Sequence, residues 1–231
     1  MAAKEFSLLS LFSDANLVSY YKMENVNDSK GSNTLTNNGT VAFNAGLFNN
    51  AADFGNPNSS KYFSGAYTFV NTNTDFSVGW WFKAPDNSNA YVSFMSDVGG
   101  GGGDEIYMGV GSAGGVDFHM VNSDGSENDQ GGSITGFDGT VWNHIMFTVV
   151  KSGSNYDKNI YHNGALIANT TITSKNSGKL GSIRVARFAA TGTYVYDGLC
   201  DDLVIFNRAL TADEISLIYN GPPSAGFMAM F

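Results

Sequence analysis

The hydrophobic residues of this chain fall mainly into short runs separated by glycine, asparagine, aspartate and serine. The clearest runs are Leu17–Met23, Phe76–Lys83, Tyr91–Met95, Ile106–Val110, Val116–Val121, His144–Val150, Asn159–His162, Ile183–Ala186 and Tyr194–Phe206. Short runs bounded by turn-forming residues are typical of strands in all-β domains. The pattern therefore predicts an antiparallel β-sandwich, and a length of 231 residues is compatible with a single domain of this class.

The run Phe76–Lys83 shows the alternation expected of a strand with two different faces. Its even-numbered positions are all hydrophobic and include Trp80, whereas Trp81 belongs to the odd-numbered set. Successive side chains of a strand point to opposite faces of the sheet. Trp80 is therefore expected in the core. Trp81 is either presented on the opposite face or buried there by loops, and the alternation allows both.

Local signals predict one hairpin and one helix. Asn163-Gly164 lies between two hydrophobic arms, and this dipeptide favours the positive φ angles of a type I′ turn. Thr211–Glu214 has the form of a capping box, which marks the start of a helix. Gly221 and Pro222 end it, because glycine favours the left-handed C-cap and proline lacks an amide hydrogen. The fold is thus expected to include one short C-terminal helix.

The two ends of the chain differ from the domain between them. Residues 1–14 form an N-terminal arm with apolar positions in Phe6–Phe12, residues 15–221 form the domain, and residues 222–231 form an apolar C-terminal tail. An exposed apolar segment tends to associate with other surfaces. The arms are therefore expected either to contact neighbouring subunits of an assembly or to pack on their own sandwich.

Composition limits the classes of partner. The net charge is −9, and the 12 lysines and arginines are scattered, so no basic surface for nucleic acid is expected. The single cysteine, Cys200, excludes an internal disulfide. No hydrophobic run approaches the ~18 residues that span a membrane. The N-terminal residues do not resemble a signal peptide, and the location of the protein is left undetermined.

No arrangement of residues indicates catalysis. Gly99–Gly103 is followed by Asp104 and Glu105, and a strand-like run comes next. A phosphate-binding loop would need a Gly-Lys-Ser/Thr ending and a helix, so this segment is interpreted as a mobile hairpin tip. The three histidines lack the spacing of a metal site. The chain is therefore predicted not to be an enzyme.

An ordered set of segments carries a family resemblance: Tyr20–Glu24, Asp28–Gly31, Phe76–Lys83, Trp142–His144, Tyr161–Gly164 and Gly198–Ile215. They resemble, in this order, the opening strand and turn, the central tryptophan strand, the Trp-x-His strand with its hairpin, and the closing Asp-rich strand and helix of laminin-G-like domains. These domains belong to the concanavalin A-like lectin/glucanase superfamily.

The resemblance implies a concanavalin A-like jelly roll over residues 15–221. It implies that Trp81 lies on the concave face, where saccharides stack in related proteins. It also implies a calcium ion held by the Asp201 carboxylate and a backbone carbonyl near Gly46, because calcium binds oxygen ligands. The alternative is that Asp201 only accepts hydrogen bonds from a neighbouring loop. Alternation along the strand places Asp202 on the other face.

Glucanases of this superfamily use a Glu-x-Asp-x-x-Glu arrangement, which is absent here. The favoured function is therefore a non-catalytic lectin-like surface module. We expect it to be a structural or decoration component of a virus or phage particle, located on the virion surface, with host-glycan binding and with neighbouring subunits that contact the terminal arms. The alternative is a stand-alone carbohydrate-binding protein, and a glycoside hydrolase is the more remote alternative.

Overall fold

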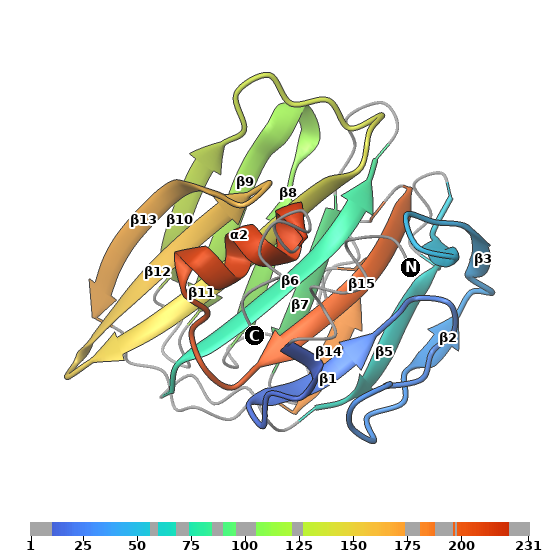
Figure 1. Ribbon diagram of the computed structural model, residues 1–231, viewed down its shortest axis with the longest axis horizontal. Helices are drawn as coiled ribbons and strands as arrows, with labels where there is room; N and C mark the ends of the chain where they lie inside the picture. The colour runs from blue at the N-terminus through green and yellow to red at the C-terminus, as the bar shows by residue number, and fades with distance from the viewer. Residues whose placement is uncertain are drawn as a thin grey trace, which may run out of the picture.

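The computed structural model describes residues 11–55, 60–67, 74–84, 90–95, 105–121, 127–173, 181–187, 196 and 198–221. Within these ranges, two antiparallel β-sheets pack face to face, and helix α2 (Ala212–Asn220) lies across the outer face of one of them (Figure 1). The predicted antiparallel β-sandwich with a short C-terminal helix is confirmed.

The two sheets, called A and B, are defined by their strand orders over the described residues. Sheet A has eight strands: β13 (Ala165–Thr173), β12 (Asn155–His162), β11 (Asn143–Ser152), β6 (Phe76–Lys83), β15 (Leu199–Phe206), β4 (Asn50–Asp53) and β3 (Ala42–Ala45), with β1 (Leu17–Tyr21) also paired to β15. Sheet B has seven strands: β10 (Glu127–Ser133), β9 (Gly115–Val121), β8 (Glu105–Val110), β7 (Ala90–Met95), β14 (Ser182–Val185), β5 (Tyr62–Ala66) and β2 (Thr36–Asn38). A 3-10 helix, Ser112–Gly114, connects β8 and β9.

The main core lies between the two sheets and is formed by alternate residues of their strands. The even-numbered residues of β6 all point into it, as the alternation predicts. Trp80 is fully buried and stacks on Phe147 of β11, with ring centroids 5.6 Å apart. Removing a large aromatic side chain from water stabilises the fold by about 2–3 kcal/mol.

A second hydrophobic cluster fills the space between α2 and the outer face of sheet A. Its buried members are Leu11, Leu17, Tyr20, Met146, Tyr161, Val204, Phe206, Leu210, Ile215 and Ile218. Gly79 of β6 makes room for it, because a Cβ atom at this position would lie 2.4 Å from the Cε of Met146. The outer face of sheet A is therefore packed with the chain's own side chains.

Helix α2 has the ends that the sequence predicts. Thr211 and Glu214 form the capping box, and Gly221 follows the last turn with φ 76°. Arg208 ties the start of the helix to the N-terminal segment, since its Nη2 lies 2.6 Å from Asp14 Oδ2 and 2.6 Å from Glu214 Oε1.

The hairpin between β12 and β13 is also as predicted. Asn163 has φ 48° and Gly164 has φ 80°, as a type I′ turn requires. The side-chain oxygen of Asn163 accepts a hydrogen bond of 2.8 Å from the amide of His144. This contact joins the turn to the preceding strand of sheet A.

The hydrophobic pattern does not predict strands β2, β3, β4, β5 and β10. Strands β2 and β3 have only three and four residues and lie at the ends of their sheets. Strand β2 is polar, and β10 has the sequence Glu-Asn-Asp-Gln-Gly-Gly-Ser. Backbone pairing with a neighbouring strand, rather than burial of alternate side chains, defines such strands. These strands can therefore be recognised only in the structure, where their pairing with neighbouring strands is known.

Several predictions concern residues outside the described ranges: Gly99–Gly103 with Asp104, residues 1–10, and residues 222–231. The described part of the N-terminal arm packs on its own domain. Leu11 belongs to the cluster beneath α2, Phe12 packs against it, and the Nζ of Lys30 donates a hydrogen bond of 2.7 Å to the Phe12 carbonyl. Among the helices that the structure describes, none is long and hydrophobic enough to be a transmembrane span.

Candidate functional site

Trp81 lies on the outer face of sheet A, as the alternation of β6 predicts, but it is not exposed. The side chain is 2% exposed, and its ring stacks on Tyr219 of α2 with centroids 5.6 Å apart and an interplanar angle of 22°. His144 contacts the indole from the side, at 5.0 Å. Helix α2 therefore covers the position at which the resemblance implies a saccharide, and in this arrangement Trp81 cannot stack on a sugar.

Asp201 and Gly46, the two predicted calcium ligands, are close in space. A Cβ atom at Gly46 would lie 2.7 Å from Oδ2 of Asp201. The same oxygen accepts hydrogen bonds from the amides of Leu47, at 2.9 Å, and Phe48, at 3.1 Å. Asp201 thus makes the loop hydrogen bonds of the alternative interpretation, and these bonds attach the turn between β3 and β4 to β15.

The prediction that Asp202 points to the other face is wrong, because β15 contains a bulge. The register between β15 and β6 shifts after Asp201, and Asp202 has φ 47°. Cys200 and Leu203, which flank the pair, both point into the core. The bulge leaves both carboxylates on the outer side of sheet A, where Asp202 accepts a hydrogen bond from the hydroxyl of Tyr20.

This pair of buried carboxylates fits a cation only in part. Desolvation, together with the charge of Asp202, raises the pKa of Asp201 to about 8. Oδ1 of Asp201 is buried without a hydrogen-bond partner in the described structure. A calcium ion would offset both effects, but it takes six to eight oxygen ligands. The residues that the structure describes contain no group of three or more His, Cys, Asp or Glu placed to hold a metal. Backbone carbonyls and water would have to supply the other ligands.

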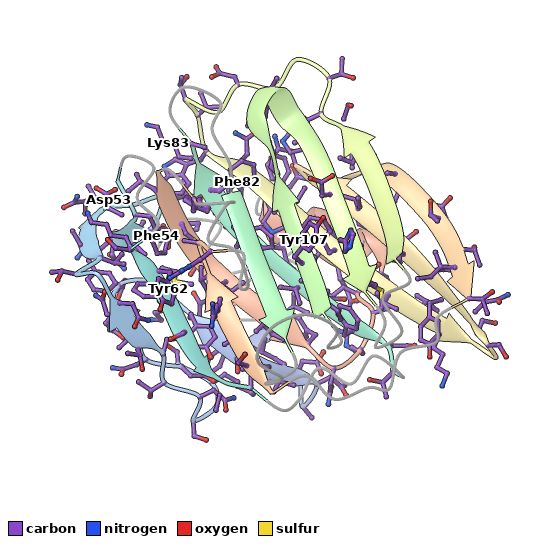
Figure 2. The ribbon with its side chains drawn as sticks, turned by 180° about the vertical axis from the view of Figure 1, so that it is seen from behind. Asp53, Phe54, Tyr62, Phe82, Lys83 and Tyr107 are labelled. Carbon is purple, nitrogen blue, oxygen red and sulfur yellow. The ribbon has the colours of Figure 1, made fainter. Side chains whose placement is uncertain are left out.

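The outer face of sheet B differs from that of sheet A. No helix among the described residues lies over it (Figure 2). A row of paired positions crosses β2, β5, β14, β7, β8 and β9: Thr36, Ser64, Arg184, Ser93, Tyr107 and His119. Sequence neighbours of this row belong to the main core: Phe63, Ile183, Val185, Ile106, Met108, Phe118 and Met120. The side chains of Thr36, Ser64, Arg184, Tyr107 and His119 in this row therefore point away from the core.

Two aromatic groups stand on this surface. Tyr107, labelled near the middle of the sheet in Figure 2, stacks on His119 with ring centroids 4.3 Å apart and an interplanar angle of 16°. Tyr62 on β5 lies under two guanidinium groups, with its ring centroid 5.8 Å from Cζ of Arg184 and 4.7 Å from Cζ of Arg187. We call the surface formed by Thr36, Tyr62, Ser64, Tyr107, Arg184 and Arg187 the sheet B face. His119 lies beside Tyr107 but is buried, with 5% of the residue exposed.

The hydrophobic pattern of the sequence does not predict this surface, although some of its residues carry a recognisable signal. Tyr107 alternates with the core residues Ile106 and Met108 in a predicted strand, which places an aromatic ring on the outer face. Arg184 and Arg187 are two of the three arginines in the chain and lie in or next to another predicted strand. Tyr62 has no comparable signal, because its strand is not predicted.

Comparison with known families decides the classification. A laminin-G family model, described as the concanavalin A-like lectin/glucanases superfamily, matches residues 57–216. The chain belongs to this superfamily. The resemblance carried by the ordered sequence segments is thereby confirmed. No curated protein matches the chain by sequence.

Solved structures of other members of the concanavalin A-like fold are similar at low identity. The binding domain of botulinum neurotoxin serotype G is 18% identical, with a TM-score of 0.67 over 88% of this chain and 50% of that chain. The serotype D ligand-binding domain in complex with N-acetylneuraminic acid is 14% identical, with a TM-score of 0.66 over 92% of this chain and 52% of that chain. Domain 4 of AbnA, an extracellular GH43 arabinanase from Geobacillus stearothermophilus, is 19% identical, with a TM-score of 0.65 over 88% of this chain and 98% of that chain; its structure is in complex with arabinotriose.

The extent of these matches differs between the neighbours. This chain spans about half the length of the neurotoxin binding domains, at 50% and 52%, but nearly all of the arabinanase domain. At such identities the likeness shows a shared fold. The binding properties of the neighbours remain their own.

Proposed function

We propose that this chain is a non-catalytic, lectin-like module that binds saccharides on the sheet B face. The observation that carries the proposal is the outward row of polar and aromatic side chains centred on Tyr107. Saccharide sites combine aromatic rings, which stack on the apolar faces of sugars, with a few polar groups that orient the hydroxyls. The sheet B face offers both kinds of group, whereas the equivalent face of sheet A is filled by α2 and its cluster.

The structural neighbours support the proposal as analogies. One of them holds arabinotriose and another holds N-acetylneuraminic acid, and both share the fold of this chain. They are described as a domain of an arabinanase and as a ligand-binding domain. Since a fold hosts many functions, these matches raise the plausibility of saccharide binding without fixing the ligand.

The absence of catalysis is part of the proposal. The sequence has no Glu-x-Asp-x-x-Glu segment, so the paired carboxylates that glucanases of this superfamily place on one strand are missing. A hydrolase would need an acid and a second carboxylate on opposite sides of a glycosidic bond. Incubation of the protein with saccharides that it binds is expected to yield no shortened products.

A calcium ion beside Asp201 is a further element of the proposal. Two features support it: the buried Asp201 oxygen without a hydrogen-bond partner, and the neighbouring Asp202 carboxylate. Such an ion would neutralise part of the charge and hold the turn that contains Gly46 against β15. Calcium at this position stabilises the domain and does not touch the sheet B face.

The role in a virus or phage particle stays a prediction. Its main support in the sequence is the apolar character of the terminal segments, and most of their residues lie outside the described ranges. Leu11 and Phe12 pack on their own domain. These two residues therefore do not support contact with a neighbouring subunit. The assembly prediction depends on the remaining residues of the two terminal segments.

A glycan array followed by calorimetry tests the proposal. The full chain is compared with Tyr107→Ala, which removes a ring from the sheet B face. The matched control is Tyr219→Ala, which removes a ring from the face covered by α2. We expect at least one saccharide class to bind the full chain and the control, and to bind Tyr107→Ala about tenfold or more weakly, in line with the loss of one stacking contact. Binding that is unchanged in Tyr107→Ala would exclude the sheet B face.

A further inference from the structure

The arginines of this chain are distributed unevenly. Of the three, two meet over a single ring on the sheet B face, where Cζ of Arg187 lies 4.7 Å and Cζ of Arg184 lies 5.8 Å from the centroid of Tyr62. Arg184 belongs to β14 and pairs with Ser64 of β5, the strand that also carries Tyr62. Two positive charges are thus placed together on an outward surface of a protein whose net charge is −9.

The third arginine, Arg208, belongs to the segment between β15 and α2. Arg208 binds Asp14 and Glu214 by ion pairs of 2.6 Å each and joins two segments of the chain. Other cation–ring contacts of the described residues involve one cation each, such as Lys151 over Tyr156 at 5.8 Å. Among the described residues, Tyr62 alone has two cations over its ring.

The chemistry of guanidinium groups indicates the kind of ligand that such a pair attracts. Contact with an aromatic ring uses the flat face of a guanidinium, while its N–H donors lie along the edge. That edge matches the two oxygens of a carboxylate, and the resulting charge-assisted hydrogen bonds are about twice as strong as neutral ones. An anionic ligand placed near two guanidinium groups is attracted by both positive charges.

The position of the pair relative to Tyr107 fits a saccharide with more than one ring. Arg184 pairs with Ser93 of β7, and Ser93 pairs with Tyr107 of β8. Two strand spacings separate Arg184 from Tyr107 along this row, or about 10 Å. A sugar ring stacked on Tyr107 and an acidic group at Arg184 can therefore belong to the same oligosaccharide.

We infer that the saccharide recognised by the sheet B face is acidic, and that Arg184 and Arg187 pair with its carboxylate while Tyr107 stacks on a sugar ring. The inference rests on the proposed function, since it names the substrate class of the same site. It adds charge as the property by which this surface distinguishes saccharides. Neutral oligosaccharides of the same shape are expected to bind more weakly.

Matched pairs of ligands test this inference. The probes are oligosaccharides of galacturonic or glucuronic acid and glycosides of N-acetylneuraminic acid, each compared with its own methyl ester, which has the same rings without the charge. Calorimetry of the full chain is expected to show at least one acid bound about tenfold or more tightly than its ester. Arg184→Gln and Arg187→Gln are expected to abolish this difference. Lys151→Gln, which removes a cation on β11 from the ring of Tyr156 on β12, should leave it unchanged.

The outcomes separate this inference from the proposed function. If acids and esters bind equally and Tyr107→Ala weakens both, the sheet B face binds saccharides and the acidic specificity is wrong. If neither the array nor the matched pairs show binding, both statements are wrong. Should the glutamine variants fail to fold, the salt dependence of the full chain decides. The affinity for the acid must then fall as sodium chloride is raised, while the affinity for the ester stays constant.

Discussion

The phenol ring of Tyr219 lies 5.6 Å from the indole of Trp81, and the two ring planes differ by 22°. This contact joins the last helix of the domain to the central strand of sheet A and closes the outer face of that sheet. It gives the two sheets different roles. Sheet A packs against described parts of the chain on both of its faces, whereas no described helix covers the outer face of sheet B.

The Trp81–Tyr219 contact predicts that Tyr219→Ala affects stability. Loss of a half-buried ring that stacks on a buried indole is expected to lower the free energy of unfolding by about 1–3 kcal/mol, as measured by urea denaturation. Leu166→Ala is the control, because Leu166 on β13 is exposed and its loss is expected to cost less than about 1 kcal/mol. Equal losses in the two variants would show that α2 contributes little through this contact.

Trp81 shows what the alternation of hydrophobic residues along a strand can predict and what it cannot. The pattern of β6 correctly assigns Trp80 to the core and Trp81 to the opposite face, because strand geometry is local. Whether that face is open depends on Tyr219 and the rest of α2, which come from a distant part of the sequence. The sequence does predict the helix, through its capping box and C-cap, but no local signal says which surface the helix covers.

Asp202 illustrates a second limit. Two consecutive aspartates in a strand are expected on opposite faces, and only a positive φ at Asp202 places both on one side. The two carboxylates at this bulge are held by partners from other parts of the chain: the amides of Leu47 and Phe48 in the turn between β3 and β4, and the hydroxyl of Tyr20 on β1. The family resemblance predicts that Asp201 and a backbone carbonyl near Gly46 hold one calcium ion, and the structure places Asp201 and Gly46 close together. The shared environment of Asp201 and Asp202, by contrast, depends on the bulge.

The ion pairs of Arg208 predict an acid-sensitive contribution to stability. Hydrogen bonds from Arg208 lower the pKa of Glu214, and at Asp14 hydrogen bonds from Asn16 and Arg208 outweigh desolvation and lower the pKa as well. Both carboxyl groups are ionised more readily in the folded state than in the unfolded state. Their contribution to the free energy of unfolding is therefore present above pH about 4.5 and is lost as the pH falls below that value. Arg208→Ala is expected to cost about 1–3 kcal/mol at pH 7.

The pH dependence distinguishes these ion pairs from simple packing of the Arg208 side chain. The difference in melting temperature between Arg208→Ala and the unmodified chain should narrow between pH 5 and pH 3, because the carboxylates become protonated in both proteins. Arg208→Lys should recover only part of the loss, since an ammonium group cannot make the paired hydrogen bonds to both acids. A loss of the same size at every pH would contradict the ionic explanation.

Lys158 predicts a gain of stability on substitution. This lysine of β12 is fully buried, its Nζ donates a hydrogen bond of 2.8 Å to the Phe118 carbonyl, and burial lowers its pKa to about 7. The unfolded chain holds the proton up to pH about 10.4. Between pH 7 and pH 10 the unfolded state therefore binds more protons, and the stability of the unmodified chain increases with pH.

Lys158→Met removes this proton-dependent cost. The variant is expected to exceed the unmodified chain in free energy of unfolding by about 1–3 kcal/mol at pH 7 or below, and this advantage should shrink towards pH 10. Denaturation in a series of buffers measures it. Lys151→Met, at an exposed position of the neighbouring strand, is the control and should show no such trend. If the variant is less stable than the unmodified chain at all pH values, the interactions of the buried Lys158 ammonium group fully offset the cost of its desolvation.

Asp201 predicts the opposite dependence on pH, and this dependence also tests the calcium proposal. Desolvation and the charge of Asp202 raise the pKa of Asp201 to about 8, compared with about 3.9 in an unfolded chain. The folded state therefore binds more protons than the unfolded state between about pH 4 and pH 8. The contribution of Asp201 to the free energy of unfolding is complete below about pH 4 and is lost as the pH rises through 8. In Asp201→Asn the amide oxygen can still accept the hydrogen bonds from Leu47 and Phe48, but no charge develops. We expect the variant to unfold at a higher temperature than the unmodified chain at pH 8–9 without calcium, with little difference at pH 4–5.

Calcium should reverse this order if it binds at Asp201. An ion that binds only the folded state raises stability by mass action, so millimolar calcium is expected to raise the melting temperature of the unmodified chain at pH 8, and EDTA should lower it again. Asp201→Asn should respond to neither, whereas the control Asp53→Asn, which removes a carboxylate from β4, should respond like the unmodified chain. Because the buried carboxylate must be ionised to bind the cation, the calcium effect on the melting temperature should also weaken as the pH is lowered from 8 to 5.

One outcome would contradict the calcium proposal. If calcium does not change the melting temperature of the unmodified chain at pH 8, but the chain loses stability between pH 5 and pH 8, Asp201 is a buried acid without a metal, held in place by the turn that contains Gly46.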